Sequence, residues 1–213
     1  MKGCRPLTIK ESEDVFRAYS GRHKLRNQCL HMLCITTGLR VSEALSLRVG
    51  DVIKKGKVVR RVKIARANIK RKKSGRIVEL VSPARAAVER QLQWLLSHGY
   101  LSRDQYLFRS QVGDRPILPA EAWKVFNAAA RKAGLDEDLG TLGTHSWRKT
   151  FADQAYKFFI SQNQKGMAIH PLLETSRALD HKSVESTEQY ISFNRESQDS
   201  AMRFMEAAHN YAK

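Results

Sequence analysis

The sequence predicts a mainly α-helical domain of the α+β class with a small antiparallel β-sheet. Three observations lead to this prediction. Several segments repeat apolar residues at helical spacing, one basic segment carries β-branched residues on both sides of a Ser-Gly turn, and no linker rich in Pro, Gly or Ser divides the 213 residues. Apolar residues make up 42% of the chain, which is enough for a sizeable core. We therefore expect a single domain over residues 1–213.

The ends of the helices are indicated by apolar stripes and by residues that begin or stop a helix. Apolar residues recur at helical spacing from Leu30 to Thr37, and Gly38 follows where a helix end favours positive φ. The next helix is expected to begin around Val41, and Ser82 is expected to cap a later one that has proline at its first position. The helix that follows Ser82 is expected to end at Gly99. A polar loop from Arg103 to Pro119 comes next, and further helices are expected from Pro119 to Gly134, from about Thr144, and from Ser197 to Tyr211.

The charge of the chain is concentrated in one segment. Lys and Arg number 38 against 21 Asp and Glu, which gives a net charge of +17 and excludes an ordinary enzyme acting on neutral metabolites. Twelve basic residues and no acidic one lie between Lys54 and Arg76. Such a run is usually a solvated face, but here Val and Ile alternate with the charges, which predicts a basic hairpin with Arg71 to Ser74 near its tip. Because no basic amphipathic helix accompanies it, we expect it to bind nucleic acid rather than a membrane.

The same composition predicts the cellular compartment. No apolar run reaches the roughly 18 residues that a membrane helix needs, and the first residues carry no secretory signal. Cys4, Cys29 and Cys34 form no pair at metal-binding spacing, so we expect reduced structural thiols, no metal and a cytoplasmic protein.

Three short clusters hold the residues suited to chemistry: Thr37 to Glu43, Thr144 to Thr150, and Leu179 to Tyr190. Each has an ordinary structural explanation when taken alone. An Arg and a Glu three residues apart form a common helix ion pair, a His and an Arg three apart can line a solvated groove, and a single Tyr is commonly a core or rim aromatic.

Taken together, the order and spacing of these clusters resemble the catalytic domain of the tyrosine recombinase, or phage integrase, family. The likeness covers nearly the whole chain from Pro6 and includes the Thr-Gly-Leu-Arg-Val-Ser-Glu block, His145-x-x-Arg148, and His181 with Tyr190 nine residues later. The resemblance implies a metal-independent enzyme without a cofactor that cuts and rejoins duplex DNA through a 3′-phosphotyrosyl link, in integration, excision or inversion. The implied catalytic set is Arg40, Lys70, His145, Arg148, His181 and the nucleophile Tyr190.

The chemistry of phosphodiester cleavage requires this inventory. Attack on the phosphate builds negative charge on two oxygens, which the planar forks of Arg40 and Arg148 suit. A tyrosine is only about one part in a thousand ionised at pH 7, so Tyr190 needs a base, for which His145 is the candidate. The leaving 5′ oxygen needs a general acid, which a hairpin lysine supplies, and His181 would donate a hydrogen bond to the phosphate.

The hairpin lysine is the open assignment within this set. Lys70 looks like the first lysine of the family's Lys-Gly-Lys type of turn, while Lys72 and Lys73 remain alternatives. The other cations of the turn are expected to hold DNA phosphates. The predicted DNA-binding residues are Arg71, Lys72, Lys73 and Arg76.

The chain also departs from the family pattern. Asp180 stands where glycine is usual before the second histidine, and Trp147 stands where leucine is frequent before the second arginine. The N-terminal core-binding domain common in the family is expected to be absent. The resemblance suggests double-stranded DNA as partner, a homo-tetramer on DNA with a monomer or weak oligomer when free, and accessory DNA-bending proteins. Two alternatives are a non-catalytic DNA-binding protein with the same fold and a topoisomerase-like enzyme.

Overall fold

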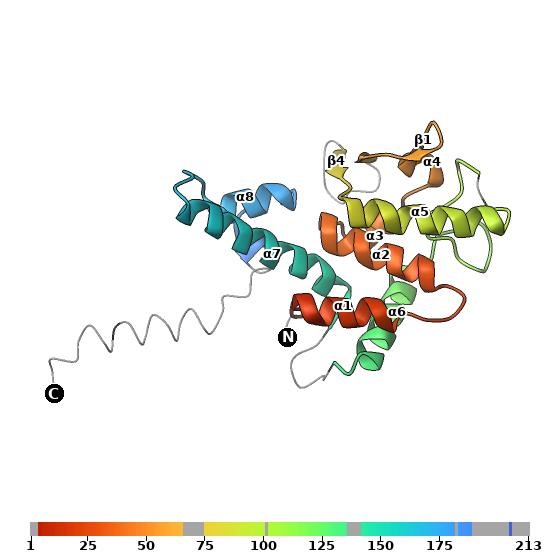
Figure 1. Cartoon of the computed structure of the whole chain (residues 1–213), viewed down its shortest axis with the longest axis horizontal. Helices are drawn as coiled ribbons and strands as arrows, with labels where there is room; N and C mark the ends of the chain where they lie inside the picture. The colour runs from red at the N-terminus through yellow and green to blue at the C-terminus, as the bar shows by residue number, and fades with distance from the viewer. Residues whose placement is uncertain are drawn as a thin grey trace.

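A computed structural model describes residues 4–65, 75–100, 102–135, 142–181, 183–188 and 205 (Figure 1). Several sequence predictions fall elsewhere in the chain. Lys70, Arg71, Lys72, Lys73 and Tyr190 lie outside the described residues, as does the expected helix from Ser197 apart from Met205.

The described residues confirm a mainly helical fold with small antiparallel sheets. The helices are α1 (Ile9–Ala18), α2 (Lys24–Thr37), α3 (Val41–Leu45), α4 (Val49–Val52), α5 (Ser82–Ser97), α6 (Pro119–Lys132), α7 (Thr144–Gln164), α8 (Pro171–Ala178) and α9 (Glu185–Glu188). The strands are β1 (Ile53–Lys54), β2 (Lys57–Val58), β3 (Arg61–Ile64) and β4 (Arg76–Glu79). Among these, no helix is long and apolar enough to cross a membrane.

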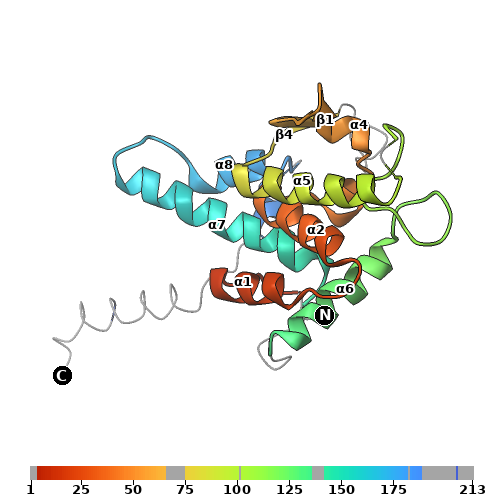
Figure 2. The same cartoon turned by 45° about the vertical axis from the view of Figure 1, so that its right-hand side comes forward.

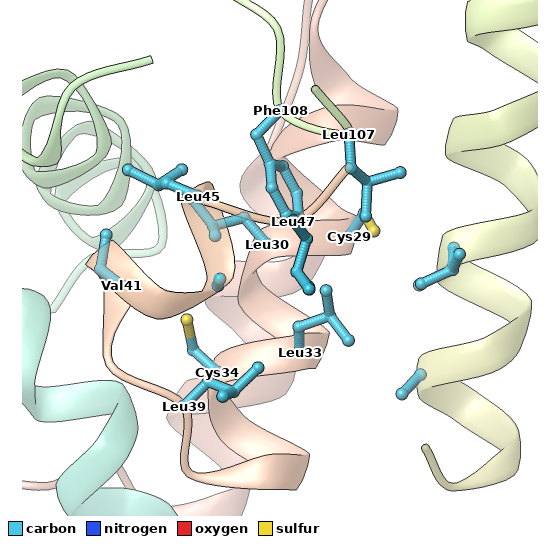
Figure 3. Packing of buried hydrophobic residues seen from close by; sticks show 14 of the residues in the cluster. Cys29, Leu30, Leu33, Cys34, Leu39, Val41, Leu45, Leu47, Leu107 and Phe108 are labelled. Atoms are coloured by element: carbon cyan, nitrogen blue, oxygen red, sulfur yellow. The ribbon is translucent and has the colours of Figure 1, made fainter. Parts of the chain in front are cut away.

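The core is built around α2, which packs on α5 and on α7 (Figures 1 and 2). Four residues of α2 form a buried stripe: Cys29, Leu30, Leu33 and Cys34. The stripe packs with other buried side chains, among them Phe108 from the segment between α5 and α6 (Figure 3). The stripe has the predicted helical spacing. Both cysteines are free thiols, and burial raises the pKa of Cys34 to about 12, which keeps it unreactive.

Most predicted helix ends agree with the structure, with one correction. Helix α2 ends at Gly38, whose φ of 63° is the left-handed conformation expected there. Helix α5 begins one residue earlier than predicted, because Val81 rather than Ser82 is its N-cap. Four of the described helices were not predicted: the four-residue helices α4 and α9, α1, which begins with a capping box between Thr8 and Glu11, and α8, which has proline in its first turn.

The predicted basic hairpin is present as the antiparallel pair β3 and β4. Its register pairs Arg61 with Glu79 and Ile64 with Arg76. The predicted tip, from Arg71 to Ser74, lies outside the described residues. A second pair, β1 and β2, was not predicted; its turn contains Lys55 and Gly56, both at positive φ. Both pairs lie beside α5 at one side of the molecule (Figures 1 and 2).

Candidate active site

The side chain of Arg148 joins two segments that the sequence predicts to be catalytic. Arg148 lies in the second turn of α7 and is 1% exposed. One terminal nitrogen donates to the carbonyl of Gly38 and the other to the carbonyl of Leu179, at 2.7 Å. Gly38 is two residues before Arg40, and Leu179 is two residues before His181. A single guanidinium therefore brings the start of α3 and the end of α8 to the first turns of α7.

The close approach of these segments requires glycine at position 38. A Cβ atom added to Gly38 would lie 2.5 Å from the ring of Phe151 and 3.1 Å from the side chain of Leu179. Its left-handed φ independently disfavours other residues. The Thr-Gly-Leu-Arg sequence thus stops α2 and lets the following loop pack against α7 and the end of α8.

The side chain of Arg40 is held at the N-terminus of α3 by Glu43. Its Nη1 lies 2.8 Å from Oε1 of Glu43, and its backbone N–H donates to Oε2 at 3.0 Å. The predicted i, i+3 ion pair is therefore present. The side chain of Glu43 is 1% exposed, whereas that of Arg40 is 32% exposed. The carboxylate of the pair is therefore buried, and the arginine is partly accessible to solvent.

Arg76 occupies a different environment from the one predicted. Its side chain, which we expected among the outward cations of the hairpin, is only 10% exposed. It contacts Oε2 of Glu43 at 2.9 Å and the carbonyl of Leu179 at 3.2 Å. The strand alternation explains the difference, because Arg76 shares the inward face of β4 with buried Val78. Binding of DNA phosphates by Arg76 stays a prediction, and this inward contact was missed.

His145 lies one helix turn before Arg148, in the first turn of α7. His145 lies at the surface, but desolvation by the surrounding protein lowers the pKa of its imidazole, and the positive charges of Arg148, Arg40 and Lys149 lower it further. The imidazole is therefore neutral at pH 7, the form that can accept a proton.

His181 is positioned by the way α8 ends. The helix closes with hydrogen bonds from the backbone N–H of His181 to the carbonyl of Ser176 and from Asp180 to Arg177, with Asp180 at a φ of 54°. A left-handed residue just after a helix is usually glycine, which explains the family preference at this position, and aspartate tolerates it. The ring of His181 is oriented by Thr187 of α9, whose hydroxyl lies 2.8 Å from Nδ1.

Four of the six predicted catalytic residues are thus described and lie on connected segments: Arg40, His145, Arg148 and His181. A comparison of the chain with known families matches residues 6–197 to the phage integrase family. The chain belongs to this family. The prediction of the family and of its fold class from the sequence is confirmed.

Individual phage integrase relatives show the same likeness. The chain is 28% identical over 199 residues to a probable integrase/recombinase, YoeC, of Bacillus subtilis, covering 93% of this chain and 95% of that protein. It is 35% identical over 131 residues to the tyrosine recombinase XerD of Corynebacterium glutamicum, covering 60% of this chain and 38% of XerD. A crystal structure of XerH site-specific recombinase bound to a palindromic difH substrate superposes with a TM-score of 0.68 at 22% identity, over 97% of this chain and 54% of XerH. The chain therefore spans nearly all of YoeC and about half or less of the two Xer proteins.

Proposed function

We propose that the protein is a site-specific DNA recombinase that cleaves and rejoins duplex DNA through a covalent bond to Tyr190. The observation that carries the proposal is the contact of Arg148 with the carbonyls of Gly38 and Leu179, because it joins the segments that contain Arg40 and His181 to the helix that contains His145 and Arg148. Membership of the phage integrase family supports recombination over the two alternatives, a non-catalytic DNA-binding protein and a topoisomerase-like enzyme.

In this proposal, Arg40 and Arg148 stabilise the charge that develops on the phosphate. Attack converts a singly charged phosphodiester into a transition state with more negative charge on its non-bridging oxygens. Arginines whose acceptors are already fixed by the fold need little rearrangement when that charge appears. The carboxylate of Glu43 and the carbonyls of Gly38 and Leu179 supply these fixed contacts.

The proton of Tyr190 is transferred to His145 in the proposed reaction. The lowered pKa of His145 supports this role, since a neutral imidazole is available to accept a proton at neutral pH. The tyrosine oxygen forms a bond to phosphorus as the bond from phosphorus to the 5′ oxygen breaks. The 5′ oxygen takes a proton from the hairpin lysine, for which Lys70 is our choice over Lys72 and Lys73, and His181 donates a hydrogen bond to a phosphate oxygen.

The covalent intermediate keeps the energy of the broken bond, so a 5′ hydroxyl can reverse the step without ATP. We propose double-stranded DNA in the cytoplasm as the substrate, with Arg71, Lys72 and Lys73 contacting its phosphates. A homo-tetramer on DNA and accessory DNA-bending proteins belong to the same proposal. The net charge of +17 supports binding to a polyanion of this kind.

The proposal is tested by trapping the covalent intermediate. Nicked duplexes from the genomic neighbourhood are incubated with the protein without added metal, and a protein–DNA band that resists SDS is sought. We expect this band with the wild-type protein and not with Tyr190→Phe, while a mobility shift of the same DNA persists in both. Equal band yield in the two proteins would contradict the role of Tyr190.

Two further outcomes separate the alternatives. A clear mobility shift without a covalent band on any substrate would favour the DNA-binding protein. Relaxation of supercoiled plasmid of arbitrary sequence, with no sequence-dependent product, would favour the topoisomerase-like enzyme.

A further inference from the structure

Arg76 shares hydrogen-bond acceptors with Arg40 and Arg148, the two arginines proposed to hold the phosphate and called here the clamp arginines. Its guanidinium bridges Glu43, 33 residues earlier in the chain, and the carbonyl of Leu179, 103 residues later. Because the side chain is 10% exposed and Glu43 is 1% exposed, this bridge lies below the surface.

Each acceptor of Arg76 is shared with a clamp arginine. The carboxylate of Glu43 binds Arg76 through Oε2 and Arg40 through Oε1. The carbonyl of Leu179 accepts from Arg76 and from Arg148. The cluster therefore holds three guanidinium groups and one carboxylate, and it retains an excess of positive charge for an incoming phosphate.

The position of the Arg76 guanidinium is set by the sheet. Arg76 is the first residue of β4 and pairs with Ile64 of β3, and its side chain points inward with that of Val78. The planar fork of arginine reaches two acceptors in different directions, which a single ammonium group cannot do equally well. This geometry accounts for arginine rather than lysine at this position.

We propose that Arg76 is a positioning residue of the cleavage reaction rather than a DNA-phosphate contact. Glu43 is buried and needs donors on both oxygens. Nη1 of Arg40 donates to Oε1, while Arg76 and the backbone N–H of Arg40 donate to Oε2. The side chain of Arg40 therefore needs only one contact with Glu43 and can direct the rest of its guanidinium toward the phosphate. Without Arg76, Oε2 of Glu43 keeps only the backbone N–H of Arg40 as donor, so the guanidinium of Arg40 is drawn toward that oxygen as well. The turn that carries His181 also loses one of its two arginine contacts. This inference rests on the proposed recombinase function.

The test compares Arg76→Gln and Arg76→Lys with the wild-type protein by two measurements. One is the single-turnover rate of covalent adduct formation at saturating DNA. We expect Arg76→Gln to lower this rate by about 10- to 100-fold, in the range found when groups that orient catalytic ligands are removed, and Arg76→Lys to lower it less. The matched control is Arg115→Gln, which removes an arginine from an ion pair with Glu121 away from the site and is expected to leave the rate unchanged.

The second measurement is DNA affinity over a range of salt concentrations. A residue that contacts a phosphate contributes about one unit to the slope of log K against log salt. We expect the slope and the affinity of Arg76→Gln to equal those of the wild-type protein within about twofold. A slope reduced by about one, together with weaker binding, would overturn the proposal in favour of a phosphate contact. If Arg76→Gln does not fold, the same two measurements on Arg76→Lys decide, because a positioning role predicts a lower rate at unchanged slope.

A double-variant comparison distinguishes positioning of Arg40 from general loss of structure. If Arg76 acts through Glu43 on Arg40, replacing Arg76 in an Arg40→Gln background should cost much less in rate than it does in the wild-type background. Equal costs in both backgrounds, or an unchanged rate in Arg76→Gln, would overturn the proposal. Absence of adduct with the wild-type protein would instead contradict the proposed function, and this inference with it.

Discussion

The indole Nε1–H of Trp147 donates a hydrogen bond of 2.8 Å to Nδ1 of His31, which joins the start of α7 to the middle of α2. Because an indole nitrogen can only donate, Nδ1 of His31 is the acceptor, and Nε2 carries the proton that faces the hydroxyl of Ser12 at 3.0 Å. The ring of Trp147 also stacks on Phe126 with centroids 3.9 Å apart. Trp147, which stands where leucine is frequent in the family, therefore packs the first turns of α7 against α2 and α6. These turns carry Arg148.

This hydrogen bond predicts that acid destabilises the protein through His31. Complete burial lowers the pKa of His31 to about 3, far below its value of about 6.5 in an unfolded chain. The unfolded state therefore binds the proton first as the pH falls, so the stabilisation is complete above pH 6.5 and is lost progressively below it, by up to roughly 1.4 kcal/mol for each pH unit.

The variant His31→Gln isolates this contribution, since an amide can accept from Trp147 and donate to Ser12 but does not titrate. We expect the free energy of unfolding to fall more steeply between pH 6.5 and 4.5 in the wild-type protein than in His31→Gln, as measured by urea unfolding at several pH values. Parallel curves for the two proteins would contradict the role of His31.

A second prediction concerns the tight packing at Gly38. In Gly38→Ala the added methyl group meets Phe151 at 2.5 Å and also forces a left-handed φ on alanine. We expect a loss of roughly 2–4 kcal/mol in unfolding free energy, from the sum of overpacking and backbone strain. The slower cleavage expected from displacement of the Gly38 carbonyl would be measured by adduct formation.

Gly134→Ala is the matched control for this variant. Gly134 has a similar φ of +73° after α6, but a Cβ atom there meets nothing within 4 Å. We expect Gly134→Ala to lose only the unfolding free energy that corresponds to the left-handed backbone strain, about 1 kcal/mol. Equal losses of unfolding free energy in the two variants would show that the contact with Phe151 does not restrict the size of the side chain at position 38.

The sequence predicted much of the fold because strong local signals mark it. The stripe on α2, Gly38 after it, and the β-branched residues of β3 and β4 each determine structure over a few neighbouring residues. Helix α1 was missed although Thr8 and Glu11 form a recognisable capping box. Its short apolar face is completed only by tertiary packing, which the pattern does not contain.

The site was predicted in its residue types but not in its supporting contacts. Arg76 was grouped with neighbouring cations by charge, whereas the two-residue period of β4 would have placed it on the inward face with Val78. The bond between His31 and Trp147 spans 116 residues and leaves no local pattern. The hydrogen bond from Arg148 to the carbonyl of Leu179 likewise depends on how the end of α8 is placed relative to α7, which no local pattern indicates.

A third prediction concerns the conformation of Asp180. Because its φ of 54° is tolerated by Gly, Asn and Asp and disfavoured for other residues, we expect Asp180→Asn and Asp180→Gly to unfold at nearly the wild-type denaturant concentration. Asp180→Ala should lose about 1 kcal/mol. Asn and Ala both remove the carboxylate, so the comparison separates backbone strain from charge; equal stability of these two variants would show that strain is unimportant here.

The last prediction concerns the ionisation of His145 and can be measured without DNA. Desolvation by the surrounding protein and the nearby positive charges of Arg148 and Arg40 disfavour the imidazolium form. We therefore expect NMR titration of the His145 ring protons to give a pKa below 6.5 in the wild-type protein. Replacing Arg40 with Gln removes one of the repelling charges, so the pKa should rise, while remaining lowered by desolvation and by Arg148.

The same shift should be visible in the reaction. If neutral His145 accepts the proton of Tyr190, the rate of adduct formation should rise with pH through the pKa of His145 and level off above it. Arg115→Gln, remote from the site, should leave both the titration and the rate profile unchanged. A His145 pKa that does not move in Arg40→Gln would mean that the two side chains do not share one electrostatic site, and the assignment of His145 as the base would lose its physical support.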